Sequence, residues 1–371
     1  MNVLYFFTYD YSLKTWKDSG NLDRELYYFQ KHYEKFKTKH ILITYGGKED
    51  SDLLQNIKYI EVIPIYTFVK YSNNKFIRFI KSFYIPFVLN KLVKNIDILK
   101  QNQLNGSWVP ILFKLITKKP LYIRTGYDMY EFSILENKSF ILKRFFRTLT
   151  KVAIKFSDLY SVTSRSDKSF LENNFKIEQN KLIIRPNWII LRELNVKKEF
   201  NNTLISIGRL EKQKNYMDLL KRLCGSEIDL HIYGNGSEKS NLIDFSKNNN
   251  IKLIIHNVVP NDKIQSILLK HSIFISNSIY EGNPKSVLEA MALGCVVVVS
   301  NIKNHSEIIE NGKTGILFEK DDNLEKIIKD LFSNKSKIEY LAKNAQEYVK
   351  SNNSIEILLL KENNDMKSLL G

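Results

Sequence analysis

Short apolar runs alternate with longer amphipathic segments along the whole chain. The runs have the length of strands, and the segments between most of them repeat apolar residues at helical spacing, as in Leu22–Phe36 and Trp108–Ile116. The strands that we expect are Val3–Thr8, His40–Tyr45, Ile57–Ile63, Ile96–Lys100, Leu121–Thr125, Asp158–Thr163, Lys181–Arg185, Thr203–Ile207, Asp229–Tyr233, Lys252–His256, Ile273–Ser276, Val296–Ser300 and Gly315–Phe318. Such alternation predicts an α/β fold with parallel sheets that carry helices on both faces.

The length of 371 residues exceeds the size at which a single core stops growing, so we expect two domains. A polar, strand-poor stretch from Asn187 to Asn202 follows Pro186 and marks the boundary. We therefore expect domains at 1–190 and 191–347, followed by a terminal segment at 348–371. Ligands of parallel sheets bind beyond the carboxyl ends of the strands, so the cleft between the two domains is the expected site.

Cysteine content and hydropathy indicate a cytoplasmic protein. Cys224 and Cys295 lack the spacing of metal ligands, and we interpret both as reduced core residues. No run approaches the roughly 18 apolar residues that span a bilayer. The first residues, MNVLYFFTYD, have no basic region before the apolar run, which favours a core strand over a signal peptide.

The net charge of +16 is concentrated in the N-terminal half. Residues 1–190 hold 31 Lys and Arg against 17 Asp and Glu, a net charge of +14, and the remainder holds 25 against 23, or +2. This asymmetry indicates an anionic partner for the N-terminal half, for which a membrane surface and a phosphorylated substrate both qualify.

Two basic, aromatic-rich segments, Lys75–Tyr84 and Lys138–Phe156, contain no acidic residue. If helical, the first places its aromatic residues on one face, with Lys75, Arg78 and Lys81 beside them. A helix of this kind can lie on an anionic bilayer. Alternatively, the apolar faces belong to the core and the basic residues form a solvated rim.

The stretch Ile275–Gly294 joins a strand to a helix through a polar loop. Pro284 suits the first position of that helix, whose free N–H groups favour an anion. Glu281 and Glu289 frame this helix start, and each carboxylate can accept hydrogen bonds from neighbouring hydroxyls. The arrangement suits a sugar nucleotide, with hydroxyls at both ends and a diphosphate between them. The alternative is an ordinary loop with solvated glutamates.

A second stretch, Leu204–Asn215, ends a strand at Gly208, where backbone can approach a ligand closely. Arg209 and Lys214 follow it. A guanidinium and an ammonium together commonly neutralise a diphosphate, although a basic surface turn would look the same.

Together, the two stretches resemble the family-4 glycosyltransferases, which are retaining enzymes with the GT-B fold. That fold consists of two Rossmann-like, doubly wound domains that face each other across a cleft. The resemblance covers most of residues 203–320, whereas the N-terminal half matches in layout only. The matching residues are Gly208, Arg209, Leu210, Lys214, Glu281, Gly282, Asn283, Pro284, Glu289, Ala292, Leu293, Gly294, Glu307, Gly312 and Gly315, with the strand Val296–Val299.

The resemblance implies transfer of a sugar from a UDP- or GDP-sugar to a hydroxyl of a glycan or lipid-linked acceptor, with retention of configuration. Arg209 and Lys214 would hold the diphosphate and stabilise the leaving group, Glu281 would orient the sugar, and Glu289 would bind the ribose. Because these cations supply positive charge, we expect no metal and no cofactor. The remaining donor-binding residues would be Gly208, Gly234, Gly282, Asn283, Pro284, Lys285 and Ser286.

The chain departs from the family at Tyr127-Asp128, where many members have a His-Asp pair. Asp128 is a candidate catalytic residue, and Tyr127 and Arg124 are candidates for the acceptor side. The alternative is a structural turn in which Asp128 caps the next element. We interpret Asp50-Ser51-Asp52, which superficially resembles a metal motif, as part of a solvated loop.

Charge and family habit together favour surface-polysaccharide or glycolipid synthesis at the inner face of a bacterial cytoplasmic membrane, with no nucleic-acid partner. By analogy with the family, helices of segment 348–371 would cross back to the first domain. Two alternatives remain open. One is a non-catalytic, sugar-nucleotide-binding or membrane-anchoring subunit. The other is a glycoside hydrolase, which would need paired carboxylates but would leave Arg209 and Lys214 without a role.

Overall fold

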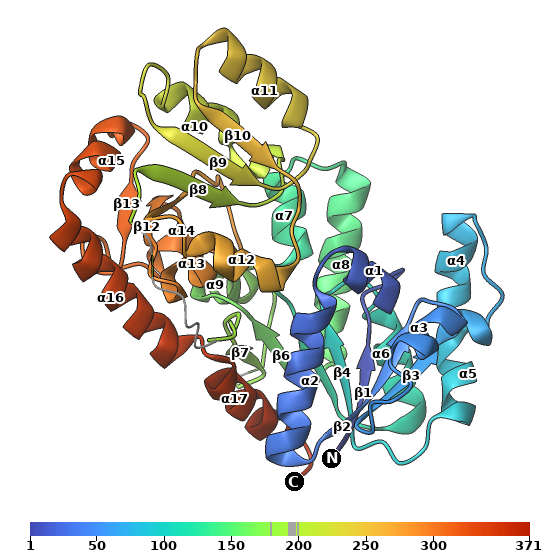
Figure 1. The fold of residues 1–371 in the computed structure, drawn as a ribbon. Coiled ribbons are helices and arrows are strands. Elements are labelled where there is room, and N and C mark those ends of the chain that lie inside the picture. The colour runs from blue at the N-terminus through green and yellow to red at the C-terminus, as the bar shows by residue number, and fades with distance from the viewer. Residues whose placement is uncertain (179, 192–197, 199) are drawn as a thin grey trace. The chain divides into compact units, whose positions relative to one another are not determined.

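The computed structural model describes residues 1–178, 180–191, 198 and 200–371. These divide into two compact units (Figure 1): unit 1 holds Met1–Pro186 and Leu358–Gly371, and unit 2 holds Asn187–Ile357. Each unit is built on one parallel sheet, which confirms the predicted α/β, doubly wound class.

The divisions lie at 186/187 and 357/358, whereas we expected them at 190/191 and 347/348. Hydrogen bonds explain both shifts. The backbone N–H of Asn187 donates to the Asn283 side chain at 2.9 Å, and that of Ile189 donates to the Asn353 carbonyl at 2.9 Å. Asn187 and Ile189, before the first expected boundary, and Asn353, after the second, are therefore tied to unit 2.

Unit 1 contains a seven-stranded sheet of order β3-β2-β1-β4-β5-β6-β7. Its strands are β1 (Asn2–Phe6), β2 (Lys39–Thr44), β3 (Ile60–Pro64), β4 (Ile98–Asn102), β5 (Leu121–Arg124), β6 (Leu159–Val162) and β7 (Leu182–Ile184). Its helices are α1 (Leu13–Asp18), α2 (Leu22–Phe36), α3 (Lys48–Leu53), the 3-10 turn η1 (Ile65–Thr67), α4 (Lys75–Ser82), α5 (Ile85–Leu92), α6 (Trp108–Thr117), α7 (Met129–Leu135), α8 (Phe140–Phe156) and α9 (Arg165–Asn174), followed by α17 (Ile355–Ser368) from Leu358 onward.

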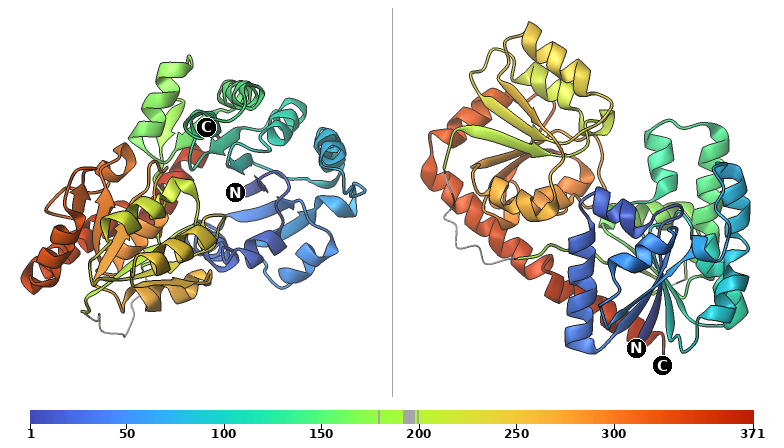
Figure 2. Two further views of the ribbon diagram at one scale, coloured as in Figure 1. Left: turned by 90° about the horizontal axis from the view of Figure 1, so that it is seen from above. Right: turned by 45° about the vertical axis from the view of Figure 1, so that its right-hand side comes forward.

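The helices of unit 1 form a layer on each face of its sheet. Helices α5, α6 and α8 pack side by side on one face, and α2 packs on β2 on the other (Figure 2). Helix α17 joins α2, because the Tyr28 hydroxyl of α2 donates to Glu362 of α17 at 2.7 Å. Lys100 of β4 also pairs with Glu362, at 2.6 Å. The end of the chain is therefore part of the core of unit 1.

Unit 2 contains a six-stranded parallel sheet of order β10-β9-β8-β11-β12-β13. Its strands are β8 (Thr203–Ile207), β9 (Asp229–Tyr233), β10 (Leu253–His256), β11 (Ile273–Ser276), β12 (Val296–Ser300) and β13 (Ile316–Phe318). Its helices are the 3-10 turn η2 (Lys212–Lys214), α10 (Tyr216–Arg222), α11 (Lys239–Asn248), α12 (Asn261–Leu268), α13 (Lys285–Ala292), α14 (Lys303–Ser306), α15 (Leu324–Phe332) and α16 (Lys335–Asn352).

The four valines of β12 show why this sheet needs helices on both faces. Val296 and Val298 lie in one buried cluster, and Val297 and Val299 lie in another on the opposite face. Successive side chains of a strand point to opposite faces, so a continuous apolar run requires two covered faces.

Two expectations about individual residues were wrong, and neither alternative for the basic residues of Lys75–Tyr84 describes Arg78. The Arg78 side chain is buried and pairs with Asp10 at 2.7 Å. Asp50 is buried rather than solvated, and it accepts hydrogen bonds from the backbone N–H groups of Leu13 and Lys14 at 3.0 and 3.2 Å. Cys224 is exposed, whereas Cys295 is buried as expected.

The segment Lys75–Tyr84 is divided between core and surface. Phe79 packs against Tyr9 and Trp108, but Phe76 and Tyr84 expose 71% and 61% of their surface. In the described residues, no helix is long and apolar enough to cross a membrane.

Candidate active site

The two motifs identified in the sequence follow neighbouring strands of unit 2. Strand β8 pairs with β9 on one side and with β11 on the other, so the order of strands reverses at β8. Loops that leave the carboxyl ends of strands at such a switch point diverge and commonly bind ligands. Residues 208–215 follow β8 and residues 277–284 follow β11, so both loops emerge at this point.

Glycines allow the loops after β8 and β9 to touch through their backbones. A Cβ atom on Gly234 would lie 1.9 Å from the carbonyl oxygen of Gly208, and one on Gly236 would lie 2.4 Å from that of Leu210. A Cβ atom on Gly208 would lie 3.0 Å from Cε of Lys214. Any larger residue at 234 or 236 must therefore move the loop that carries Arg209 and Lys214.

Lys214 and Glu281 form an ion pair that joins the two motifs. Their side chains are only 15% and 10% exposed, and the Ser278 hydroxyl donates a second hydrogen bond to Glu281 at 2.7 Å. Burial alone raises the pKa of Glu281, but the Lys214 charge and these hydrogen bonds outweigh it and lower the pKa below its usual value. Glu281 is therefore an ionised carboxylate that fixes the Lys214 ammonium.

Gln213 supplies a second link between the loops. Its side-chain amide donates to the Tyr280 backbone carbonyl at 2.9 Å, and its backbone carbonyl accepts from the Ile279 backbone N–H at 2.9 Å. Arg209 is exposed, and its one hydrogen bond within the described part of the chain runs to the Gln213 amide oxygen at 3.3 Å. The guanidinium is thus held at the edge of the site while most of its N–H groups face solvent.

Helix α13 begins one residue later than expected. Pro284 is its N-cap, with an extended ψ of 101°, and the first helical residue is Lys285. Within the described residues, no side chain caps the helix, and the N–H groups in the first turn of any helix have no acceptor inside that helix. These groups and the helix dipole favour a negative charge at this end.

The other residues of this loop that we expected to bind the sugar donor have different environments. Gly282 and Asn283 are buried, and the backbone carbonyl of Asn283 accepts from the Asn187 side chain at 2.6 Å. The side-chain oxygen and the backbone carbonyl oxygen of Asn283 thus both accept from Asn187, which gives Asn283 a structural role. Ser286 and Glu289 lie on α13 and are partly exposed.

The expected residues of unit 1 follow β5. Asp128 is fully buried and caps α7, because its Oδ1 accepts from the N–H groups of Tyr130 and Glu131 at 2.9 and 3.0 Å. Its Oδ2 accepts from the Thr150 hydroxyl at 3.0 Å. Burial raises the pKa of Asp128 to about 6 despite these hydrogen bonds. The structure thus gives Asp128 the capping role that the sequence left open.

Tyr127 and Arg124 differ in their access to solvent. Tyr127 is 39% exposed, and its ring lies 4.4 Å from that of Phe132. Arg124 is buried, pairs with Glu362 at 3.3 Å and donates to the carbonyls of residues 185 and 186. Of the two, only Tyr127 presents its side chain to solvent.

Sequence reasoning missed His305. This residue belongs to α14 and is buried, and its charge would interact with that of Glu281. Its Nδ1 contacts the Ser300 carbonyl at 2.8 Å, and burial lowers the pKa of the imidazole to about 4. It is therefore neutral at physiological pH. Its position two residues before Glu307, in a stretch that already resembled the family, was a signal that could have identified it.

Sequence reasoning also missed the switch point of unit 1, between β1 and β4. A Cβ atom on Gly106 there would lie 2.9 Å from the backbone nitrogen of Tyr9. Asp10, in the same loop as Tyr9, has a φ of 65° and pairs with Arg78. The order of strands, which identifies this point, cannot be read from the strand pattern alone.

Comparison with known proteins finds similarity to glycosyltransferases. Residues 190–348 match the model of the family described as glycosyl transferases group 1. An uncharacterized glycosyltransferase of Haemophilus influenzae is 27% identical over 271 residues, which cover 70% of this chain and 74% of that protein. An N-acetylgalactosamine-N,N'-diacetylbacillosaminyl-diphospho-undecaprenol 4-alpha-N-acetylgalactosaminyltransferase of Campylobacter jejuni is 23% identical over 270 residues, or 68% of this chain and 72% of that protein.

The fold has close counterparts among solved structures. The crystal structure of Anabaena Alr3699/HepE in complex with UDP and glucose has a TM-score of 0.77 at 15% identity, covering 99% of this chain and 100% of that chain. This similarity confirms the GT-B fold expected from the sequence. The match of residues 190–348 to the glycosyl transferases group 1 model likewise confirms the resemblance to that family that the sequence suggested.

Proposed function

We propose that the chain transfers a sugar from a nucleotide diphosphate sugar to an acceptor hydroxyl and retains the anomeric configuration. The observation that carries this proposal is that the loop with Arg209 and Lys214 and the loop that leads into α13 leave neighbouring strands at the switch point of unit 2, where the Lys214–Glu281 ion pair joins them. Two cations and a helix start suit a diphosphate. The UDP and glucose bound to the similar Anabaena protein support a UDP- or GDP-sugar as donor.

In the proposed reaction, the bond between the sugar and the diphosphate breaks and negative charge collects on the leaving phosphate. Arg209 and the N–H groups at the start of α13 would stabilise this charge, because donors already in place cost no reorganisation when the charge develops. Glu281 holds Lys214 in position and uses its remaining lone pairs to orient a sugar hydroxyl. Glu289 binds the ribose. The acceptor hydroxyl attacks from the face that the phosphate leaves, and its proton passes to that phosphate.

We propose that the transfer needs no metal, because these groups neutralise the diphosphate themselves. On the acceptor side, Tyr127 is exposed and can donate a hydrogen bond. Arg124 and Asp128 act as positioning residues for its loop, through the ion pair with Glu362 and the cap of α7.

The acceptor is proposed to be a glycan or a lipid-linked glycan in bacterial surface-polysaccharide or glycolipid synthesis. The Campylobacter relative, whose name specifies a diphospho-undecaprenol substrate, supports this class. The excess of +14 in residues 1–190 and the exposed side chains of Phe76 and Tyr84 support a cytoplasmic enzyme that works at an anionic membrane surface.

Donor turnover by site variants tests the proposal. Arg209→Ala and Glu281→Ala should each reduce kcat/KM by about a hundredfold or more, because each removes a group that stabilises or organises the transition state. Circular dichroism should show an unchanged fold. Lys212→Ala, from the same turn as Lys214, and the exposed Glu227→Ala should retain normal turnover. Near-normal activity of either site variant would refute the proposed roles, and donor binding without turnover by the unaltered chain would favour a non-catalytic subunit.

A further inference from the structure

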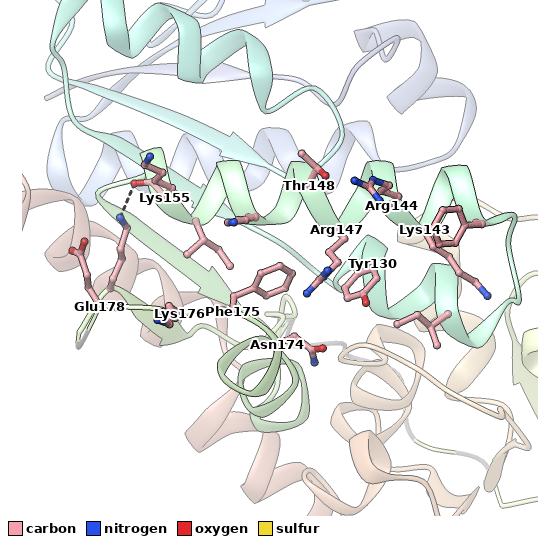
Figure 3. Close-up of a pocket in the computed structure, with 15 residues that line it drawn as sticks. Tyr130, Lys143, Arg144, Arg147, Thr148, Lys155, Asn174, Phe175, Lys176 and Glu178 are labelled. Atoms are coloured by element: carbon pink, nitrogen blue, oxygen red, sulfur yellow. Dashed lines mark hydrogen bonds between the residues drawn. The ribbon is translucent and has the colours of Figure 1, made fainter.

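A groove with a volume of about 780 Å³ runs along α8 in unit 1. Figure 3 shows Arg144, Arg147 and Lys155 along the helix and Phe175 and Lys176 on the opposite wall. Glu178 is the single acidic residue in the lining. The basic residues of the lining are Lys143, Arg144, Arg147, Lys151, Lys155, Lys176 and Lys181.

The positive charge of this groove is not balanced by the protein. Within the described residues, none of these seven side chains forms an ion pair with a carboxylate, and α8 itself contains no acidic residue. Lys143 instead donates to the Asn137 side chain at 3.1 Å, and Lys181 donates to the Lys155 carbonyl at 3.0 Å. Like charges at close spacing repel one another, so this arrangement favours an anionic ligand.

The spacing of the cations favours a ligand with several anionic groups. Lys143, Arg147, Lys151 and Lys155 recur every four residues, a little over one turn of α8. At about 1.5 Å per residue, the row is roughly 18 Å long. One small anion would occupy a fraction of it, whereas a row of phosphates would neutralise all of it.

An apolar tip adjoins the basic groove. Phe140 and Ile141 begin α8 and expose 75% and 78% of their surface, and Leu135 at the end of α7 exposes 49%. Phe140 also lines the groove, together with Ile134. A soluble polyanion would gain nothing from these side chains, but a lipid offers phosphate and acyl chains next to each other.

We propose that this groove binds the phosphate head groups of anionic phospholipids while Phe140 and Ile141 insert between the acyl chains. The proposal rests on the membrane association suggested above and specifies its site. Long basic side chains beside an apolar tip match the layered polarity of a bilayer surface. Each cation near such a surface strengthens binding about fivefold.

Flotation of the full chain with vesicles tests the proposal. The unaltered protein should float with phosphatidylcholine vesicles that contain phosphatidylglycerol and stay behind with phosphatidylcholine alone. Arg144→Gln combined with Arg147→Gln should lower the partition coefficient roughly 25-fold, because two near-surface cations are lost. Phe140→Ser combined with Ile141→Ser should also release the protein, without any change of charge.

The matched control is Lys343→Gln combined with Lys350→Gln, which removes two exposed charges from α16 in unit 2 and should retain normal flotation. Equal losses in control and groove variants would reduce the effect to net charge and overturn the proposal. So would release by glycerol phosphate at the same phosphate concentration, or binding through Arg144 and Arg147 to soluble heparin but not to vesicles. If the unaltered chain binds no vesicle, the membrane association itself is refuted. If the unaltered chain floats and the groove variants float equally well, the proposed site is wrong.

Discussion

The roles of several single residues in this chain depend on contacts with residues that are distant in the sequence. Lys214 and Glu281 are 67 positions apart, yet one ion pair joins them and links the loops after β8 and β11. The sequence could identify both residues from their motifs, but not their contact. Asp128 shows the opposite case, because its sequence position suggested catalysis and its hydrogen bonds show a helix cap.

The buried carboxyl of Asp128 should make stability depend on pH. Its pKa is about 6 in the folded chain, against 3.8 ordinarily, so the folded state binds more protons between these values. The free energy of unfolding should therefore fall by about 3 kcal/mol as pH rises from about 3 to about 7 through this one group. Asp128→Asn keeps the cap and should remove this component, as measured by urea unfolding across that range.

The comparison needs a control because other carboxyl groups titrate in the same range. Asp23→Asn changes an exposed residue of α2 and should follow the unaltered protein at every pH. If Asp128→Asn also follows the unaltered protein, the carboxyl is not held protonated by burial.

At the scale of elements, the strands were the most predictable part of the fold. All thirteen expected strands are present with ends shifted by three residues or fewer, because each is a short apolar run, and the central strands are buried on both faces. Helix α2 was expected at its observed bounds, Leu22–Phe36. The end of α4 at Ser82 and the start of a separate helix α5 at Ile85 were not predicted, because the apolar residues continue across the break.

Helix α17 should stabilise unit 1 through Glu362. This buried carboxylate pairs with Lys100 and Arg124, and although burial raises its pKa, these cations lower it to about 2. Glu362→Gln leaves the Lys100 ammonium buried without its counter-charge, which should cost about 3–5 kcal/mol in the free energy of unfolding. Urea unfolding at neutral pH measures this loss.

Two further variants separate the buried pair from the helix that carries it. Glu356→Gln changes an exposed residue of α17 and should alter stability by no more than about 0.5 kcal/mol. Lys100→Met combined with Glu362→Gln removes both charges of the pair, keeps an acceptor for Tyr28 and Arg124, and should cost less than Glu362→Gln alone. An equal or larger loss in the double variant would contradict this interpretation.

At the scale of the whole molecule, sequence and structure differ in what they reveal. The unequal charge of the two halves and the motifs of residues 203–320 were evident from the sequence and led to the family. The basic groove along α8 was not, because its far wall, with Lys176 and Lys181, comes from a segment outside that helix. Likewise, Glu362 is 262 positions from Lys100, beyond the reach of any local pattern.

The most direct measurement is thermal unfolding of the full chain with a panel of nucleotide sugars and no added metal. A ligand that binds only the folded chain stabilises it by about 2.7 kcal/mol at a hundred times its Kd. One UDP- or GDP-sugar should raise Tm of the unaltered protein and of Lys212→Ala, but not that of Arg209→Ala. If no nucleotide sugar raises Tm, or if Arg209→Ala responds as the unaltered protein does, the proposed donor site is wrong.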